Sequence, residues 1–169
     1  LSAMGIVKGD SHGKFNPNAP ITRAEFAAIA ARFDDKANTT AVDFSDIASH
    51  WAKNEISAAA NNGWINGYTD GTFRPTNNIT RAEVMTLVNR VLERGVDEEG
   101  LMEDAIQWAD NKPGDWYYYD VQEATNSHEY VRTDKPIDGR DISFEEWIEL
   151  KENRNWAELE SIWKNLYEK

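Results

Sequence analysis

The sequence predicts an all-α fold built from repeated helix-loop-helix units, with short extended segments in the loops. Three observations lead to this prediction. The string ITRAE occurs at residues 21–25 and again at residues 79–83. The stretch that begins at Gly5 and ends at Arg32 aligns without a gap to the residues 58 positions later. Apolar residues at helical spacing follow each ITRAE string. Such a period indicates one supersecondary unit used more than once, with a core shared between copies.

The ITRAE strings predict two capped helices. Thr22 and Glu25 have the spacing of a capping box. Thr80 and Glu83 repeat that spacing. The apolar residues that follow stand at positions i, i+3, i+4 and i+7, which predicts one buried face for each helix. These residues are Phe26, Ile29, Ala30 and Phe33 in the first copy and Val84, Leu87, Val88 and Val91 in the second.

A helix and a turn-rich loop precede the second capped helix. The apolar pattern predicts a helix over about residues 51–62, and Gly63 is expected to end it in the left-handed conformation. Asp70 and Gly71 predict a tight turn, and Pro75 predicts an extended chain before the next helix. One unit is therefore a helix, a glycine-bounded loop and a capped helix.

A diverged third copy follows the second. Trp116 and Val121 repeat the spacing of an earlier tryptophan and isoleucine, which predicts another leading helix. Ser143 and Glu146 keep the capping-box spacing and are expected to cap the helix after it. Phe144 takes the position that arginine holds in ITRAE. The capping pattern is therefore kept in this copy, and the cation is not.

The copies are expected to form a single domain over residues 1–169. The predicted boundaries are 1–41 for the first copy, 42–103 for the second and 104–169 for the third. Because the sequence begins inside what should be the leading helix of the first copy, we expect it to be a fragment of a longer protein. The third copy is expected to end in an amphipathic helix with Asn155 and Glu158 in capping-box spacing. Its apolar face would contain Trp156, Leu159, Trp163 and Leu166.

The composition excludes several classes of partner. The formal net charge is −12, with 18 basic and 30 acidic residues, and no basic stripe exists to neutralise the phosphates of a nucleic acid. The absence of cysteine excludes a disulfide framework and a thiolate metal site. No apolar run reaches about 18 residues, so no membrane span is expected.

The motifs of the first two copies resemble those of the S-layer homology family. In the second copy the matching segments are FSD at residues 44–46, SHWA at 49–52, GYTDGTFRP at 67–75 and ITRAE at 79–83. The first copy matches from Gly5 onward. The resemblance implies a monomer that packs three such motifs with pseudo-threefold symmetry around the capped helices.

The resemblance also implies a function. Family members are extracellular and anchor exported proteins to the bacterial cell wall without covalent bonds. Their ligand is a secondary cell-wall polysaccharide, often ending in pyruvylated N-acetylmannosamine, which binds in grooves between neighbouring motifs. The arginine of the TRAE motif is a main binding residue, so the resemblance assigns this role to Arg23 and Arg81. Phe144 breaks the pattern at the third groove.

The position of these arginines favours an anion site independently of the resemblance. Arg23 and Arg81 stand at the first position of each predicted helix, where a cation opposes the helix dipole and the capping box does not require it. A guanidinium together with free backbone N–H groups suits a carboxylate or phosphate. One charge-assisted hydrogen bond of this kind contributes about 1.5–3 kcal/mol. The alternative is that both arginines pair with carboxylates inside the protein.

Other candidate residues have two interpretations. Trp51 and Trp116 stand at matching positions and could stack on a sugar ring or pack in the core. His12, His50 and His128 share no metal-ligand spacing, so neither a metal site nor another cofactor is expected.

Glu145 and Glu146 could suggest acid–base catalysis, but Glu146 is expected to serve as a capping residue. No nucleophile elbow, phosphate loop or cysteine nucleophile is present, so the chain is not expected to be an enzyme.

The function predicted from the sequence is non-covalent anchoring to the cell wall at the cell surface. Arg23 and Arg81 are the expected ligand-binding residues, with Trp51 and Trp116 as candidate sugar platforms. The alternative is a protein-interaction or assembly module that keeps the fold and uses its aromatic third copy to contact protein.

Overall fold

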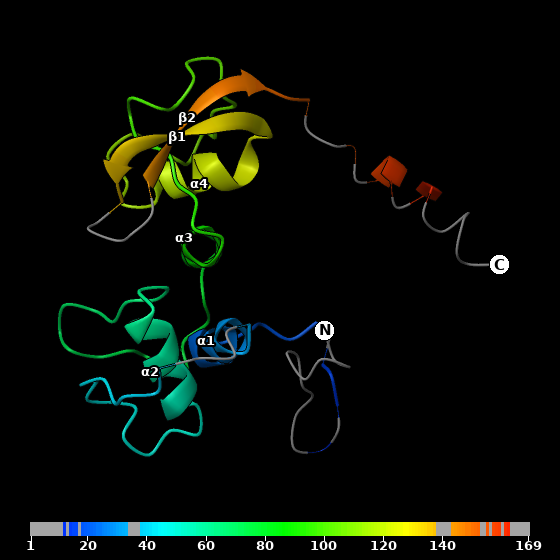
Figure 1. Ribbon diagram of the computed structural model, residues 1–169. Helices are drawn as coiled ribbons and strands as arrows, with labels where there is room; N and C mark the ends of the chain where they lie inside the picture. The colour runs from blue at the N-terminus through cyan, green and yellow to red at the C-terminus, as the bar shows by residue number, and fades with distance from the viewer. Residues whose placement is uncertain are drawn as a thin grey trace. The chain divides into compact units, whose positions relative to one another are not determined.

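The computed structural model describes residues 12, 14–16, 18–33, 38–137, 143–152, 155, 157–159 and 161–162 of the chain. In chain order the elements are α1 (Arg23–Ala31), α2 (Lys53–Asn61), α3 (Arg81–Val91), α4 (Tyr118–Thr125), β1 (His128–Pro136) and β2 (Ser143–Leu150) (Figure 1). The chain divides into a first unit, Leu1–Leu92, and a second unit, Glu93–Lys169. The predicted single domain and the boundaries of its three copies stay a prediction.

Small residues dominate the core of the first unit. Phe73, in the loop before α3, is its largest fully buried side chain, and Ile56 of α2 and Leu87 of α3 are buried in the same cluster. The other buried members of this cluster are Ala24, Ala27, Ala30, Ile47, Ala52, Ala59 and Ile65. Because α1 contributes alanines, it presents little side-chain bulk where it packs against α2.

The buried face of α1 differs from the predicted one. Ala30 is buried as expected, but Phe33 is 56% exposed. Phe26 and Ile29 are only partly buried. The alanines of α1 are the residues that face the core, which leaves the larger side chains at its margin. In this helix, the period of the large apolar residues was therefore a poor guide to the face that is buried.

The two predicted capping boxes and the predicted glycine after α2 are present in the first unit. Both capping boxes form, Thr22 with Glu25 and Thr80 with Glu83. Gly63 has a φ of 69° and follows α2 in the left-handed conformation, which a residue with a Cβ atom adopts at a cost. The described part of α2 begins at Lys53, two residues later than the sequence suggested.

The all-α prediction is wrong for the second unit, and so is the bundle of three helix-loop-helix repeats. After α4 the described chain forms an antiparallel hairpin of β1 and β2, visible at the top of Figure 1. The leading helix of the third copy was predicted correctly, since α4 begins two residues after Trp116 as α2 does after Trp51. The capped helix that should follow is replaced by β2.

Ser143 and Glu146 therefore do not cap a helix. Both lie in β2, where Glu145 and Trp147 are buried and Glu146 is exposed, as the two-residue period of a strand requires. A four-residue capping pattern is short, and tertiary pairing overrides it here. One edge of β2 pairs with β1, while the N–H groups of Glu145 and Trp147 donate to Gly95 and Gly100 at 2.8 and 2.9 Å.

The end of the chain is described only in part. The N–H of Glu158 donates to the side-chain oxygen of Asn155 at 3.3 Å, and residues 157–159 and 161–162 are helical. Leu159 is exposed, whereas Trp156, Trp163 and Leu166 lie outside the described residues, so the predicted amphipathic face stays a prediction. Among the described helices, none is long and apolar enough to cross a membrane.

Phe73→Ala should destabilise the first unit by about 3–5 kcal/mol, because it removes a fully buried aromatic ring and leaves a cavity. Phe33→Ala is the matched control, since Phe33 is mostly exposed and its loss should change the free energy of unfolding by less than about 0.5 kcal/mol. Urea denaturation of the two variants measures both values. Equal effects would contradict the described core.

Candidate functional site

The segments that lead into α1 and α3 lie side by side. Thr22 and Asn78 form an antiparallel bridge. The N–H of Ile79 donates to the carbonyl oxygen of Ile21 at 3.2 Å. The two ITRAE strings therefore meet where they begin, and the N-termini of both helices lie in one region of the first unit.

The two helix N-termini carry equivalent caps. In α1 the Glu25 N–H donates to Thr22 Oγ1 at 3.2 Å, and the Thr22 N–H donates to the Glu25 carboxylate at 2.8 Å. In α3 the same two distances are 3.3 and 2.8 Å, between Thr80 and Glu83. Because the caps are alike, any difference between the two arginines comes from what surrounds them.

Arg23 is buried, with 3% of its surface exposed, and its guanidinium is bound inside the protein. Nε donates to the carbonyl oxygen of Phe73 at 2.9 Å, and one terminal nitrogen donates to that of Asn66 at 3.0 Å. The other terminal nitrogen forms an ion pair with Glu83. The guanidinium also lies 4.8 Å from the ring centroids of Tyr68 and Phe73. The guanidinium of Arg23 is thus engaged inside the protein, and its predicted role in ligand binding stays a prediction.

The backbone of α1 is also engaged at this end. The N–H of Arg23 donates to the carbonyl oxygen of Asn77 at 2.8 Å, and that of Ala24 donates to Pro75 at 3.1 Å. Two of the N–H groups that a helix N-terminus leaves unpaired are thereby satisfied by the second copy. The N-terminus of α1 therefore serves to join the two copies.

Arg81 has the opposite environment. Its side chain is exposed, and it forms no ion pair or hydrogen bond with the residues that the structure describes. The backbone N–H groups of Arg23 and Ala24 donate to carbonyl oxygens of the second copy. Among the described residues, the N–H groups of Arg81 and Ala82 have no equivalent acceptors. As far as the chain is described, the N-terminus of α3 thus combines an exposed guanidinium and backbone N–H groups that have no partner, the arrangement expected of an anion site.

Glu83 has a second role that the sequence analysis missed. Besides capping α3, its carboxylate pairs with Arg23 and accepts from the Tyr68 hydroxyl at 3.2 Å. Burial alone would raise the pKa of Glu83. Hydrogen bonds from Thr80 outweigh burial, and the charge of Arg23 adds to them, so the pKa lies below its ordinary value of 4.5. The sequence contains one indication of this ion pair: arginine and glutamate recur together in both ITRAE strings.

The loop before α3 is held by a second set of carboxylate contacts. Asp46 accepts from the N–H groups of Phe73 and Arg74 at 2.8 and 2.7 Å. Hydrogen bonds from Thr72 and from Arg74 lower the pKa of Asp70 to about 2. Arg74 is therefore a partly exposed cation that already has a carboxylate partner, at 2.9 Å.

The two candidate sugar platforms are both on the surface. Trp51 is 61% exposed in the first unit, and Trp116 is 66% exposed in the second. The Trp51 ring lies 5.5 Å from that of His50, and the Trp116 ring packs edge-on against Tyr117 at 5.3 Å. The core alternative for these two residues is excluded by their exposure, and their contact with a sugar stays a prediction.

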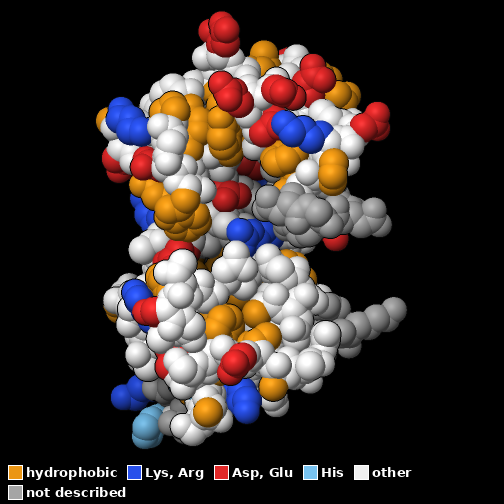
Figure 2. Space-filling view, turned by 90° about the vertical axis from the view of Figure 1, so that its left-hand side faces the viewer, with side chains coloured by type: hydrophobic (Ala, Val, Ile, Leu, Met, Phe, Trp, Pro, Cys, Tyr) orange, Lys and Arg blue, Asp and Glu red, His pale blue; other side chains and the backbone are white. Residues whose placement is uncertain are grey.

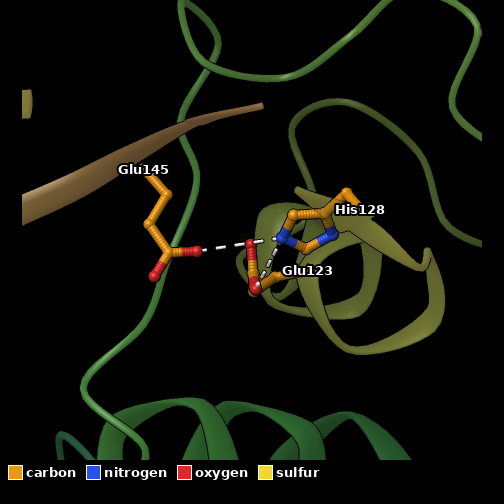
Figure 3. Close-up of side chains that lie close together, drawn as sticks. All are labelled: Glu123, His128 and Glu145. Carbon is orange, nitrogen blue, oxygen red and sulfur yellow. Dashed lines mark ion pairs between the residues drawn. The ribbon is translucent and has the colours of Figure 1, made fainter. Parts of the chain in front are cut away.

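A cluster that the sequence analysis did not find lies in the second unit. Glu123 of α4, His128 of β1 and Glu145 of β2 bring a ring nitrogen and two carboxylates together (Figure 3). Burial alone would lower the pKa of His128, but Glu123 and Glu145 raise it to about 9. The three residues come from different elements, so no spacing along the sequence could have indicated the cluster.

Comparison with known proteins supports a cell-surface context. The model of the S-layer homology domain matches residues 1–27 and 43–85. The chain is 34% identical over 146 residues to cell surface glycoprotein 1 of Acetivibrio thermocellus, covering 79% of this chain and 6% of that protein. It is 37% identical over 136 residues to a cellulosome-anchoring protein of the same organism, and the match covers 77% of this chain and 30% of that protein. A surface layer protein of Brevibacillus choshinensis is 33% identical over 101 residues, and the match covers 54% of this chain and 9% of that protein. The chain thus spans less than a third of each relative.

Glu83→Gln should lower the free energy of unfolding by about 3 kcal/mol, because it leaves the buried charge of Arg23 without a carboxylate. Glu25→Gln is the matched control. It changes the equivalent cap, and glutamine can still serve in a capping box, so its cost should be well under 1 kcal/mol. Urea denaturation measures the difference, and equal costs would show that the ion pair contributes nothing.

The contribution of Glu83 should also depend on pH. A carboxyl whose pKa is lowered by folding stabilises the protein above its ordinary pKa and loses this effect as the pH falls through the folded value. The stability difference between the wild type and Glu83→Gln should therefore be full at pH 7 and shrink as the pH falls below 4.5. A difference that stays constant down to about pH 2 would contradict the assigned role of this carboxylate.

Proposed function

The chain belongs to the S-layer homology family, and from this premise we propose that it anchors the protein that carries it to the bacterial cell surface. The proposed ligand is an anionic polymer of the cell wall, and the proposed contact is Arg81 at the N-terminus of α3. The observation that carries this proposal is the contrast between Arg23, which is engaged inside the protein, and exposed Arg81, which has no partner among the described residues, at two helices with equivalent caps.

The chemistry of this end of α3 supports an anionic ligand. The exposed guanidinium of Arg81 offers two parallel donors, which match the two oxygens of a carboxylate. The N–H groups of the first turn and the positive end of the helix dipole favour a negative charge at the same place. A carboxylate-bearing sugar, such as a pyruvylated one, is the proposed ligand because it supplies that charge on a polymer of the wall.

The relatives support the proposed location. Among them are a protein named for anchoring the cellulosome and another named as a surface layer protein. We propose the corresponding role for this chain, as a binding module at the cell surface and not as a catalyst. Exposed Trp51 is the proposed apolar platform for a sugar ring in the same unit, since an aromatic ring with one free face can cover the apolar side of a sugar.

A protein-interaction role has support from the second unit. Trp108, Trp116, Tyr130 and Ile148 are all more than two fifths exposed. The upper half of Figure 2 shows hydrophobic side chains on the surface of this unit, with acidic side chains beside them. Exposed aromatic residues are common in protein interfaces. This alternative needs a protein partner and does not involve Arg81.

Arg81→Ala should weaken sedimentation of the chain with purified cell-wall sacculi by about tenfold or more, because one charge-assisted hydrogen bond contributes about 1.5–3 kcal/mol. Arg81→Lys should also bind less well than the wild type, since an ammonium cannot form the paired contact. Neither variant should alter the fold, because the side chain is exposed.

Lys112→Ala is the matched control, since it removes an exposed cation from the second unit and should leave binding unchanged. Removing the anionic polymer from the sacculi by acid extraction should abolish binding of the wild type. If Arg81→Ala sediments as well as the wild type does, the proposed contact is wrong. Self-association of the chain without wall material, seen by light scattering, would favour the interaction module instead.

A further inference from the structure

The cluster of Glu123, His128 and Glu145 has the geometry of a ligand set. His128 Nε2 lies 3.4 Å from Glu123 Oε1 and 3.8 Å from Glu145 Oε2. Atoms that could serve as ligands, one from each residue, all lie within 4.8 Å of one another. Ligands around a tetrahedral zinc ion at about 2.0–2.2 Å lie about 3.3–3.6 Å apart. Small movements of the side chains would therefore bring all three atoms into contact with one ion.

The carboxylates of this cluster are buried without the hydrogen bonds that burial normally requires. The side chains of Glu123 and Glu145 are 1% and 0% exposed. Glu123 Oε1 and both oxygens of Glu145 accept no hydrogen bond from any residue that the structure describes. Leaving a buried charged group in this state is costly. One of these oxygens from each carboxylate, Glu123 Oε1 and Glu145 Oε2, points toward His128 (Figure 3), which is the arrangement that a bound cation would satisfy.

The surrounding residues fix each potential ligand. Nδ1 of His128 lies 2.8 Å from the carbonyl oxygen of Asn126, so Nδ1 donates there and Nε2 faces the carboxylates. Without an ion Nε2 also carries a proton, because the pKa of His128 is raised to about 9, and a binding metal ion would displace that proton to solvent. The Trp147 ring stacks on His128 at 4.0 Å, and its Nε1 donates to Glu123 Oε2 at 3.1 Å. Metal-binding histidines and carboxylates are oriented by contacts of this type.

We propose that Glu123, His128 and Glu145 form a binding site for a divalent transition-metal ion such as Zn²⁺. The mixed set of one imidazole nitrogen and two carboxylate oxygens suits zinc and its neighbours. It does not suit Ca²⁺, which takes oxygen ligands alone. The ion would join α4, β1 and β2, so its expected role is to stabilise the second unit. This site goes beyond the proposed anchoring function and lies in the other unit.

Two arginines are compatible with this site. Arg132 lies 3.1 Å from Glu145 Oε1, which leaves Oε2 directed at His128. Arg94 lies 3.7 Å from Glu123 Oε1, and about a third of its side chain is exposed, so it can withdraw to solvent when an ion binds. The arginines offset the two negative charges when no ion is bound, and Arg132 can keep orienting Glu145 when one is.

The proposal is tested by titrating the metal-free full chain with Zn²⁺ against a chromogenic chelator at fixed pH. The wild type should bind one ion per chain. Glu123→Gln and Glu145→Gln should each weaken binding by more than the roughly 10–100-fold that changes in surrounding residues cause. Trp147→Phe keeps the stacked ring and all three ligands but removes the donor to Glu123, so it should weaken binding about tenfold.

Glu146→Gln and His50→Asn are the matched controls. Glu146 is the exposed neighbour of Glu145 on β2, and His50 lies in the first unit, so both variants should bind as the wild type does. X-ray absorption at the zinc edge of the wild type should give a first shell of nitrogen and oxygen atoms at about 2.0–2.2 Å, with the outer-shell scattering of one imidazole. This measurement does not depend on whether a variant folds. The proposal would be overturned if the wild type does not bind one Zn²⁺ per chain, or if Glu123→Gln and Glu145→Gln bind Zn²⁺ as tightly as the wild type. It would also be overturned if the absorption data show a zinc ion without an imidazole ligand.

Discussion

The ion pair between Arg23 and Glu83 is the interaction on which the first unit depends. It joins the capped helix of the first copy to the capping residue of the second, and the carbonyl groups of Asn66 and Phe73 complete the hydrogen bonds of Arg23. A buried guanidinium without these acceptors would be strongly destabilising. One carboxylate therefore both caps α3 and pairs with the first residue of α1, so the helix cap and the link between the two copies depend on each other.

Local patterns predicted much of the first unit because its decisive features are local. The capping boxes, the glycine after α2 and the loop that leads into α3 all follow from short sequence signals. The difference between Arg23 and Arg81 could not be predicted in this way. Both stand in an identical pentapeptide, and only contacts between distant segments of the first unit distinguish them. Arg23 lies against Glu83, Asn66 and Phe73 of the second copy, and Arg81 has no such partner among the described residues.

The second unit shows where pattern matching fails. The segment that contains Ser143 and Glu146 satisfies a helix-capping pattern and the alternation of a strand at the same time, and the pairing available on both sides of β2 decides between them. The cluster around His128 was beyond prediction for a related reason. Its members come from α4, β1 and β2, and the sequence analysis expected a capped helix where the structure has β2.

The position of β2 has a consequence for solubility. Unpaired strand edges can recruit other chains and start aggregation. In this hairpin the middle of β2 is enclosed between β1 and the segment near Gly100, where a Cβ atom would come within 2.1 Å of the Glu145 carbonyl oxygen. Most residues of β1 are exposed, and they include Lys135 and the terminal Pro136, residue types that oppose further pairing. The sheet can thus remain two strands wide without becoming a template for aggregation.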